Sequence, residues 1–214
     1  MFTILLNPDT CQFSKKILRF LVLINIGLTM GVNASEINEV PEPLYKVEVE
    51  RHKIIEMRDG TKLATDIYRP IGVKSKLPAI LIRTPYDRKY YRIPVWLDGP
   101  RSSPSSAYFF AGQGYMVAVQ DVRGKFDSEG SFIPQAGDVD DGYDTVEWLA
   151  KQPWSNGKVG SIGCSYSGDT QILMAQAKPP HLKAMIPQAA GSVIGSADGR
   201  YRYFGVRIGG ANAL

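Results

Sequence analysis

Short, nearly continuous apolar runs alternate along the chain with longer segments in which apolar residues recur every third or fourth position. Continuous runs are typical of strands that are buried on both faces of a parallel sheet. Four such strands are expected, at 78–84, 115–120, 159–162 and 182–186. Two earlier strand-like runs, 47–57 and 61–68, meet at Asp59-Gly60, a dipeptide that favours a tight hairpin turn.

Two of the intervening segments have the periodicity of helices. In 138–151 the apolar residues share one face, and acidic residues cluster at the start, where the helix dipole favours them. A second helix is expected at 167–178, ending before Pro179. Because strands and helices alternate, the pattern predicts an α/β protein with a doubly wound, mostly parallel sheet.

Composition narrows the class of protein without indicating its chemistry. The chain has 214 residues, of which 44% are hydrophobic and 21% charged. These values are ordinary for a globular domain and exclude a disordered chain, collagen or a coiled coil. The formal net charge of +4 comes partly from the first 34 residues, so no basic surface predicts a nucleic-acid partner.

The N-terminal segment has the features of a secretion signal. Three basic residues come first: Lys15, Lys16 and Arg19. An apolar stretch follows at 20–32, and the small residue Ala34 ends a plausible cleavage site. We expect residues 1–34 to be a cleaved signal peptide, which predicts export to the periplasm or the extracellular space. A membrane anchor is the alternative, although the stretch is short for a bilayer span.

The remainder of the chain reads as a tether followed by a catalytic domain. Residues 35–46 are polar and contain two prolines, as expected of a tether, and the domain is expected at 47–214. After signal cleavage only Cys164 remains, so no disulfide within the chain is expected. The mature protein is not expected to associate with a membrane.

The candidate chemistry lies where the predicted strand 159–162 runs into Gly163-Cys164-Ser165-Tyr166-Ser167-Gly168. A serine on a sharp turn between a strand and a helix needs small neighbours and is lifted above the sheet. The helix N-terminus favours negative charge, and the N–H of the next residue would face an oxyanion. One departure from the usual G-x-S-x-G is Ser167 at the fifth position, with glycine one residue later.

Two other interpretations of this turn are open. It could be a plain glycine-rich turn, or it could bind phosphate as part of a nucleotide-binding α/β domain. The stretch from Gly163 to Thr170 nearly matches a phosphate-binding loop. Asp169, however, stands where that loop requires lysine, and a carboxylate there repels phosphate.

Five motifs in order resemble one family. The elbow itself reads G-x-S-Y-x-G, and four other segments accompany it: Met57–Leu63 with Asp66–Pro70, Arg83–Asp87, Gln120–Gly124 with Ser128–Gly130, and Gln152–Trp154 with Asn156-Gly157. Together they resemble the cocaine-esterase and X-Pro dipeptidyl-peptidase-like hydrolases, the CocE/NonD family. The resemblance covers roughly residues 50–190.

This resemblance implies an α/β-hydrolase fold and assigns roles to three residues. Ser165 would be the nucleophile, and the backbone N–H of Tyr166 and the hydroxyl of Tyr86 would form the oxyanion hole. Asp121 and Arg123 are expected to brace loops, as an ion pair. The implied substrate is a small ester, an amide or a short peptide, and no metal or organic cofactor is implied. The oligomeric state is left open.

The expected base is not found in the sequence. In this fold the nucleophile is followed by an acid and then a histidine. His52 belongs to the first hairpin, and His181 follows a helix that leads away from the elbow, so neither is expected to act as the base. We therefore interpret the chain as an N-terminal part with about six of the usual eight strands, inactive alone. A non-catalytic secreted binding protein on the same fold is the alternative.

Overall fold

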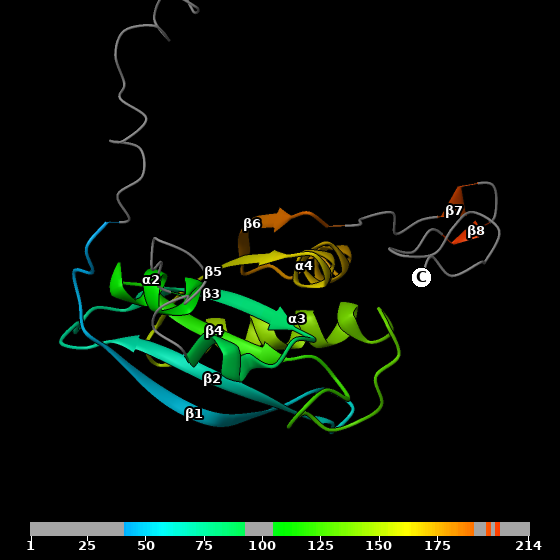
Figure 1. Ribbon diagram of the computed structural model, residues 1–214, viewed down its shortest axis with the longest axis horizontal. Coiled ribbons are helices and arrows are strands. Elements are labelled where there is room, and N and C mark those ends of the chain that lie inside the picture. The colour runs from blue at the N-terminus through cyan, green and yellow to red at the C-terminus, as the bar shows by residue number, and fades with distance from the viewer. Residues whose placement is uncertain (1–40, 93–104, 191–195, 198–199, 202–214) are drawn as a thin grey trace, which may run out of the picture. The chain divides into compact units, whose positions relative to one another are not determined.

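The computed structural model describes residues 41–92 and 105–190, together with two short strands at 196–197 and 200–201 (Figure 1). The expected signal peptide at 1–34 and the first half of the expected tether, residues 35–40, lie outside the described residues. The contacts within the chain fall into two units, residues 1–42 and residues 43–214. The second unit holds every described helix and strand.

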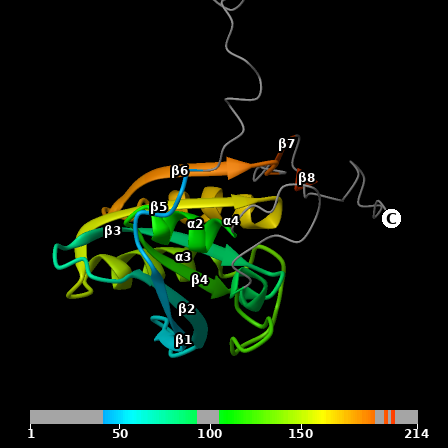
Figure 2. The ribbon, with the colours of Figure 1, turned by 60° about the vertical axis from the view of Figure 1, so that its left-hand side comes forward.

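Six strands form the main sheet. In chain order they are β1 (Val47–Glu56), β2 (Lys62–Pro70), β3 (Leu77–Thr84), β4 (Met116–Asp121), β5 (Ser155–Cys164) and β6 (Leu182–Gln188). Their order across the sheet is β1-β2-β4-β3-β5-β6, which puts β1 and β6 at opposite edges (Figure 2). β1 pairs antiparallel with β2, and β2 pairs antiparallel with β4. The strands β4, β3, β5 and β6 run parallel to one another.

Helices cover both faces of this sheet. Since successive side chains of a strand point to opposite faces, β3 sends Ala79 and Leu81 to one side and Ile80 and Ile82 to the other. The first pair packs in a core with α3 (Asp138–Ala150) and α4 (Tyr166–Gln176). The second pair packs with α2 (Ser106–Gly112). The predicted doubly wound α/β sheet is therefore confirmed.

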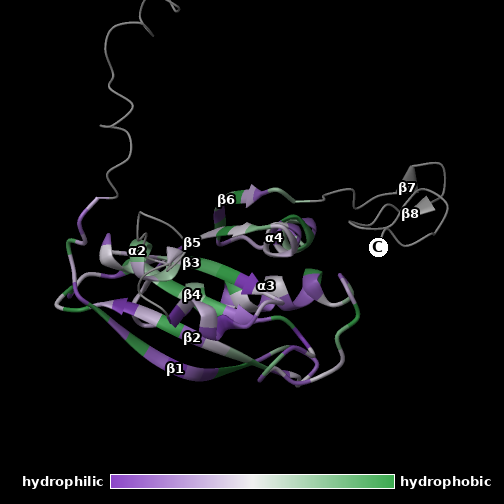
Figure 3. Ribbon diagram, viewed as in Figure 1, coloured by the Kyte–Doolittle hydropathy of each residue, from purple (hydrophilic) through white to green (hydrophobic). Residues whose placement is uncertain are grey.

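The hydropathy of the strands follows their position in the sheet. Figure 3 shows β3 and β4 largely as hydrophobic and the edge strand β1 largely as hydrophilic. Every residue of β4 is buried, whereas six of the seven residues of β6 are exposed. Continuous apolar sequence thus marks a strand with covered faces in β4, but the same expectation is wrong for β6, which lies at the edge of the sheet.

Some elements differ from the sequence-based expectation. The strand expected at 159–162 begins earlier, at Ser155, because Ser155 pairs with Leu77 on β3, and after an irregularity in register Val159 pairs with Ala79. Helix α2 and the short 3₁₀ helix η3 (Arg88–Arg92) were not expected. Two further short strands, β7 (Ser196–Ala197) and β8 (Arg200–Tyr201), pair with each other. Among the described residues, no helix is long and apolar enough to cross a bilayer.

Candidate active site

Ser165 occupies a strained turn between β5 and α4. Its backbone has φ 59° and ψ −125°, a conformation that residues with a side chain rarely adopt. The surrounding hydrogen bonds hold it there: its N–H donates to the Gln188 carbonyl at 2.9 Å, and its own carbonyl accepts from Gly168 at 2.8 Å. The turn therefore has the geometry of a nucleophile elbow, with the serine directly before the first residue of α4.

Two glycines make room for this turn. A Cβ at position 163 would lie 2.6 Å from both the Cβ and the carbonyl oxygen of Ser167. A Cβ at position 168 would lie 2.8 Å from the Gln188 carbonyl oxygen on β6. This packing explains the departure from the usual motif, because the buried, small Ser167 faces Gly163 while Gly168 lets the helix approach β6.

The structure brings Tyr86 and Tyr166 together at the elbow. The Tyr86 hydroxyl oxygen accepts a hydrogen bond from the backbone N–H of Tyr166, with 3.2 Å between the two atoms. The Tyr86 side chain is 47% exposed, so its hydroxyl is accessible to a ligand. The Tyr86 hydroxyl can also donate, so if a substrate oxygen replaced it as the acceptor of the Tyr166 N–H, both groups would lie within reach of that oxygen, as an oxyanion hole requires.

A buried arginine anchors the loop that carries Tyr86. Arg88, two residues later, has no exposed surface and makes ion pairs with Asp66 at 3.1 Å, with Asp127 at 2.8 Å and with Asp121. The N–H of Arg88 also donates to Asp121 at 2.7 Å. These contacts fasten the loop after β3 to the middle of β2, to the end of β4 and to the loop after β4.

Burial and pairing shift the pKa values in this cluster in different directions. Burial raises the pKa of Asp121 above its ordinary value, against the opposing effect of Arg88. Burial acts the same way on Asp66, but hydrogen bonds from Arg92 and the His52 N–H outweigh it and lower that pKa. Burial disfavours the charge on Arg88, yet its bonds to Asp127 and Asp121 raise its pKa. The arginine is therefore permanently charged.

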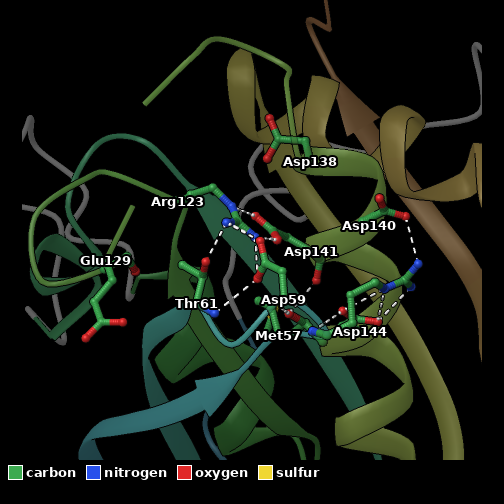
Figure 4. A network of polar contacts seen from close by, with 12 residues as sticks. Met57, Asp59, Thr61, Arg123, Glu129, Asp138, Asp140, Asp141 and Asp144 are labelled. Atoms are coloured by element: carbon green, nitrogen blue, oxygen red, sulfur yellow. Dashed lines mark hydrogen bonds and ion pairs between the residues drawn. The ribbon is translucent and has the colours of Figure 1, made fainter. Parts of the chain in front are cut away.

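The expected ion pair between Asp121 and Arg123 is wrong. Asp121 binds Arg88, whereas Arg123 pairs with Asp59 at 2.7 Å and with Asp141 at 2.6 Å (Figure 4). Both residues do brace loops, but separate ones: Arg123 joins the loop after β4 to the β1–β2 turn and to α3. Asp121 is the last residue of β4, whereas Arg123 lies in the loop after it, where the alternation of a strand no longer places side chains two positions apart on one face.

Tyr91 is a further residue at this edge that sequence reasoning missed. Its phenol is largely buried, and burial raises its pKa, with smaller contributions from nearby Tyr86 and Cys164. Its position on η3 could not be anticipated, because the sequence did not predict that helix. The signal for Arg88 was equally indirect: Asp66 lies in the strand-like run 61–68 and Asp121 directly follows the apolar run 115–120, and carboxylates that become buried at such positions need a cation.

Neither described histidine reaches Ser165. His181 lies just before β6, where its Nδ1 is 2.8 Å from Glu147 and its carbonyl accepts from Val159 on β5. Since β5 and β6 are parallel, His181 lies at the start of these strands, whereas the elbow follows the end of β5. The Nδ1 of His52 is 2.9 Å from Arg88 instead. Asp169 is buried in the first turn of α4.

Comparisons with known proteins agree with this geometry. The X-Pro dipeptidyl-peptidase (S15) family profile matches residues 59–206. Cocaine esterase from Rhodococcus sp. (strain MB1 Bresler) is 40% identical over 138 residues, which are 64% of this chain and 23% of the esterase.

Solved structures show the same likeness. An aminopeptidase from a marine sediment archaeon, Thaumarchaeota archaeon, is 35% identical with a TM-score of 0.57, covering 72% of this chain and 27% of that one. A CocE/NonD family hydrolase from Staphylococcus aureus has the same identity and TM-score, covering 66% and 27%.

The chain spans about a quarter of the length of these relatives. The resemblance to CocE/NonD hydrolases and the α/β-hydrolase fold that it implied are both confirmed. The chain belongs to the X-Pro dipeptidyl-peptidase (S15) family.

Proposed function

We propose that the protein to which this chain belongs, called the whole protein below, is a serine hydrolase that forms an acyl-enzyme on Ser165. One observation carries the proposal: the strained Ser165 stands beside two donors, the Tyr166 N–H and the Tyr86 hydroxyl, 3.2 Å apart. A strained serine at a helix N-terminus next to a donor pair is costly to build and is suited to acyl transfer.

In the proposed reaction the Ser165 Oγ attacks the acyl carbon of the substrate. The carbonyl oxygen becomes an oxyanion that accepts hydrogen bonds from the Tyr166 N–H and the Tyr86 hydroxyl. The positive end of the α4 dipole lies at the same place and favours that charge. The alcohol or amine then leaves, and water hydrolyses the acyl-enzyme to regenerate the serine.

The proton of Ser165 requires a base that His52 and His181 do not supply at their positions. We assign the base, a histidine, and its orienting acid to residues of the whole protein other than those of this chain. The 214-residue chain alone is accordingly proposed to be inactive.

Small esters, amides and short peptides are the proposed substrates. This range follows relatives whose names describe a cocaine esterase and an aminopeptidase, and a family named for X-Pro dipeptidyl-peptidases. The test compares the whole protein with its Ser165→Ala variant on 4-nitrophenyl acetate and on an X-Pro 4-nitroanilide. Ser165→Ala should abolish turnover of whichever substrate is cleaved.

A second readout identifies the nucleophile directly. A fluorophosphonate should modify the whole protein at the peptide containing Ser165, as found by mass spectrometry, and should leave Ser165→Ala unmodified. If turnover survives in Ser165→Ala, the proposed mechanism is excluded. If the whole protein neither turns over nor is modified, the non-catalytic binding protein remains, an alternative that the remote positions of both histidines favour.

We also propose that the protein is exported and that residues 1–34 are removed. The support is the order of basic residues, apolar stretch and small residue before Ser35. N-terminal sequencing of the protein recovered from the cell exterior or periplasm should begin at Ser35. Recovery of an uncleaved chain from the membrane fraction would favour the anchor instead.

A further inference from the structure

Tyr166 makes contacts with both its backbone and its side chain, and the two point to different partners. Its N–H faces Tyr86, whereas its hydroxyl reaches the start of α3. There the hydroxyl donates to Asp138 Oδ2 at 2.8 Å and accepts from the Gln135 N–H at 2.8 Å. A phenol that both donates and accepts in this way is fixed in position and in hydrogen-bond direction.

Asp138 is a rigid partner for this hydroxyl. Its other carboxylate oxygen lies 3.0 Å from Arg83 Nη1, and the same nitrogen donates to the Asp138 carbonyl at 3.0 Å. Arg83 is only 2% exposed and also donates to Gln120 Oε1 on β4 at 3.0 Å. Figure 4 shows that Asp138 points away from the Arg123 cluster, which engages Asp141 instead. The Asp138 carboxylate is thus tied to the central strands.

The Gln135 N–H is aimed at Tyr166 by an uncommon backbone. Gln135 has φ 65° and Gly137 has φ 85°, so two residues of the loop before α3 lie in the left-handed region. Glycine adopts that region readily, but glutamine does so at a cost of about 1–3 kcal/mol. The loop therefore bears strain at the residue whose N–H meets the phenol.

These contacts matter because Tyr166 is the first residue of α4. The first N–H groups of a helix have no partner within the helix, so the helix alone does not fix their direction. Hydrogen bonds hold the backbone of Ser165 on one side of residue 166. The Tyr166 side chain adds a second attachment, through the bonds of its hydroxyl to Asp138 and to the Gln135 N–H.

We propose that the Tyr166 side chain and Asp138 are positioning residues that hold the Tyr166 N–H in place as an oxyanion donor. The inference rests on the proposed function of Ser165. Loss of the bond between the Tyr166 hydroxyl and Asp138 would leave the Tyr166 N–H present but less well aimed. A misplacement of about 1 Å can lower turnover by about 10²-fold. Substrate binding before the chemical step would change little, since the donor acts mainly on the transition state.

The test is Tyr166→Phe in the whole protein, which removes one oxygen and keeps the ring and the N–H. The matched control is Tyr143→Phe on α3, because the Tyr143 ring packs on Arg58 and its hydroxyl bonds to none of the described residues. We expect kcat on 4-nitrophenyl acetate to fall about tenfold in Tyr166→Phe with KM within about twofold, and no change in the control.

An inhibitor separates positioning from general loosening of the fold. Phenylboronic acid forms a tetrahedral adduct on a reactive serine and offers an oxygen to the donors, so its affinity should fall by about the same factor as kcat. The double variant Asp138→Asn, Tyr166→Phe should lose less kcat than the two single losses combined, because both substitutions remove the bond between Tyr166 and Asp138.

The outcomes distinguish this inference from the proposed function. If Ser165→Ala abolishes turnover but Tyr166→Phe equals Tyr143→Phe in kcat and in inhibitor affinity, the positioning role is wrong and the proposed function stands. Additive losses in the double variant would also overturn the inference. If Ser165→Ala retains turnover, the proposed function itself fails.

Discussion

The backbone strain at Ser165 lowers the stability of the fold and, in the proposed function, holds the side chain where acyl transfer requires it. A side chain at φ 59° costs about 1–3 kcal/mol, which glycine would not incur. The backbone hydrogen bonds to Gln188 and from Gly168 hold this conformation and do not involve the side chain of residue 165. Residue 165 therefore carries a side chain at a place where glycine would be more stable.

Two substitutions at this position should separate the strain from the lost hydroxyl. We expect Ser165→Gly to be about 1 kcal/mol more stable than Ser165→Ala, since both lack the oxygen but only alanine keeps a Cβ. Urea unfolding of the two variants of the whole protein measures the difference. Equal midpoints would mean that the turn is relaxed.

The hydroxyl of Tyr86 is the second donor at the elbow and can be removed alone. Tyr86→Phe in the whole protein should lower kcat by about 10²-fold, a typical loss for one oxyanion donor. Tyr86 is half-exposed, and its backbone N–H donates to the Thr84 hydroxyl irrespective of the phenol oxygen, so the loop should keep its structure. Steady-state kinetics checks this, and unchanged kcat would remove Tyr86 from the site.

Among the elements, the loop after β3 depends on one buried cation. Arg88 joins β2, β4 and the loop after β4 through Asp66, Asp121 and Asp127. A buried pair adds little stability compared with an apolar replacement of both partners, but removal of one partner leaves charges uncompensated. The arrangement therefore makes the loop that carries Tyr86 rigid and makes it sensitive to single substitutions.

Arg88→Met should destabilise the fold by about 3–5 kcal/mol, because Asp121 in particular loses its cation. Arg58→Met is the control, since Arg58 is half-exposed and pairs with Asp140 and Asp144 at the surface. That variant should cost about 1 kcal/mol or less. Urea unfolding followed by tryptophan fluorescence compares them, and similar midpoints would contradict the assigned difference.

The β1–β2 turn should contribute an acid-sensitive part of the stability. Hydrogen bonds from Arg123, and then from the Thr61 N–H, hold the pKa of Asp59 well below its ordinary value. Folding thus favours the charged carboxylate, and this stability is complete above about pH 4 and is lost as the pH falls below it. Between pH 4 and pH 2 the melting temperature of Asp59→Asn should fall less steeply than that of the wild type. Parallel curves would show that the Arg123 contact is not linked to folding.

Sequence patterns predicted the elements far better than the contacts between them. The six strands of the sheet and helix α3 follow from the apolar pattern, which burial enforces, and helix α4 from its place between two strands and from the prolines that end it. Helix α2 was missed because its seven residues are too short to show a period. The partners of Arg88 and Arg123 were missed because they come from strands distant in sequence, and only the folded sheet brings them together.

At the scale of the whole molecule, the edge of the sheet at β6 is exposed in the part of the chain that the structure describes. A groove of about 270 Å³ runs beside β5 and β6 on the face that α2 covers elsewhere, and Ile80, Phe110, Ile162 and Ile186 line it. On β6, Ile186 is 51% exposed and Met185 39%. An apolar strand that pairs on one side only is prone to self-association.

The 214-residue chain expressed alone should therefore aggregate or form oligomers. Ile186→Lys should raise the soluble fraction, because a charge on an edge strand opposes pairing with another copy. Light scattering and size-exclusion chromatography of the two chains measure this. A soluble wild-type monomer with one sharp melting transition would contradict the prediction.

The contact between Ser165 and Gln188 has a consequence for synthesis. The elbow is closed by a carbonyl of the strand that follows it, since Gln188 accepts from the Ser165 N–H and lies against Gly168. A ribosome extends the chain from its N-terminus at about 5–20 residues per second. While β6 is untranslated, the turn has nothing to close it, so a nascent chain carries a relaxed, ordinary serine. The strained geometry of the turn, which the proposed chemistry requires, can then arise only after that strand has left the ribosome and docked beside β5.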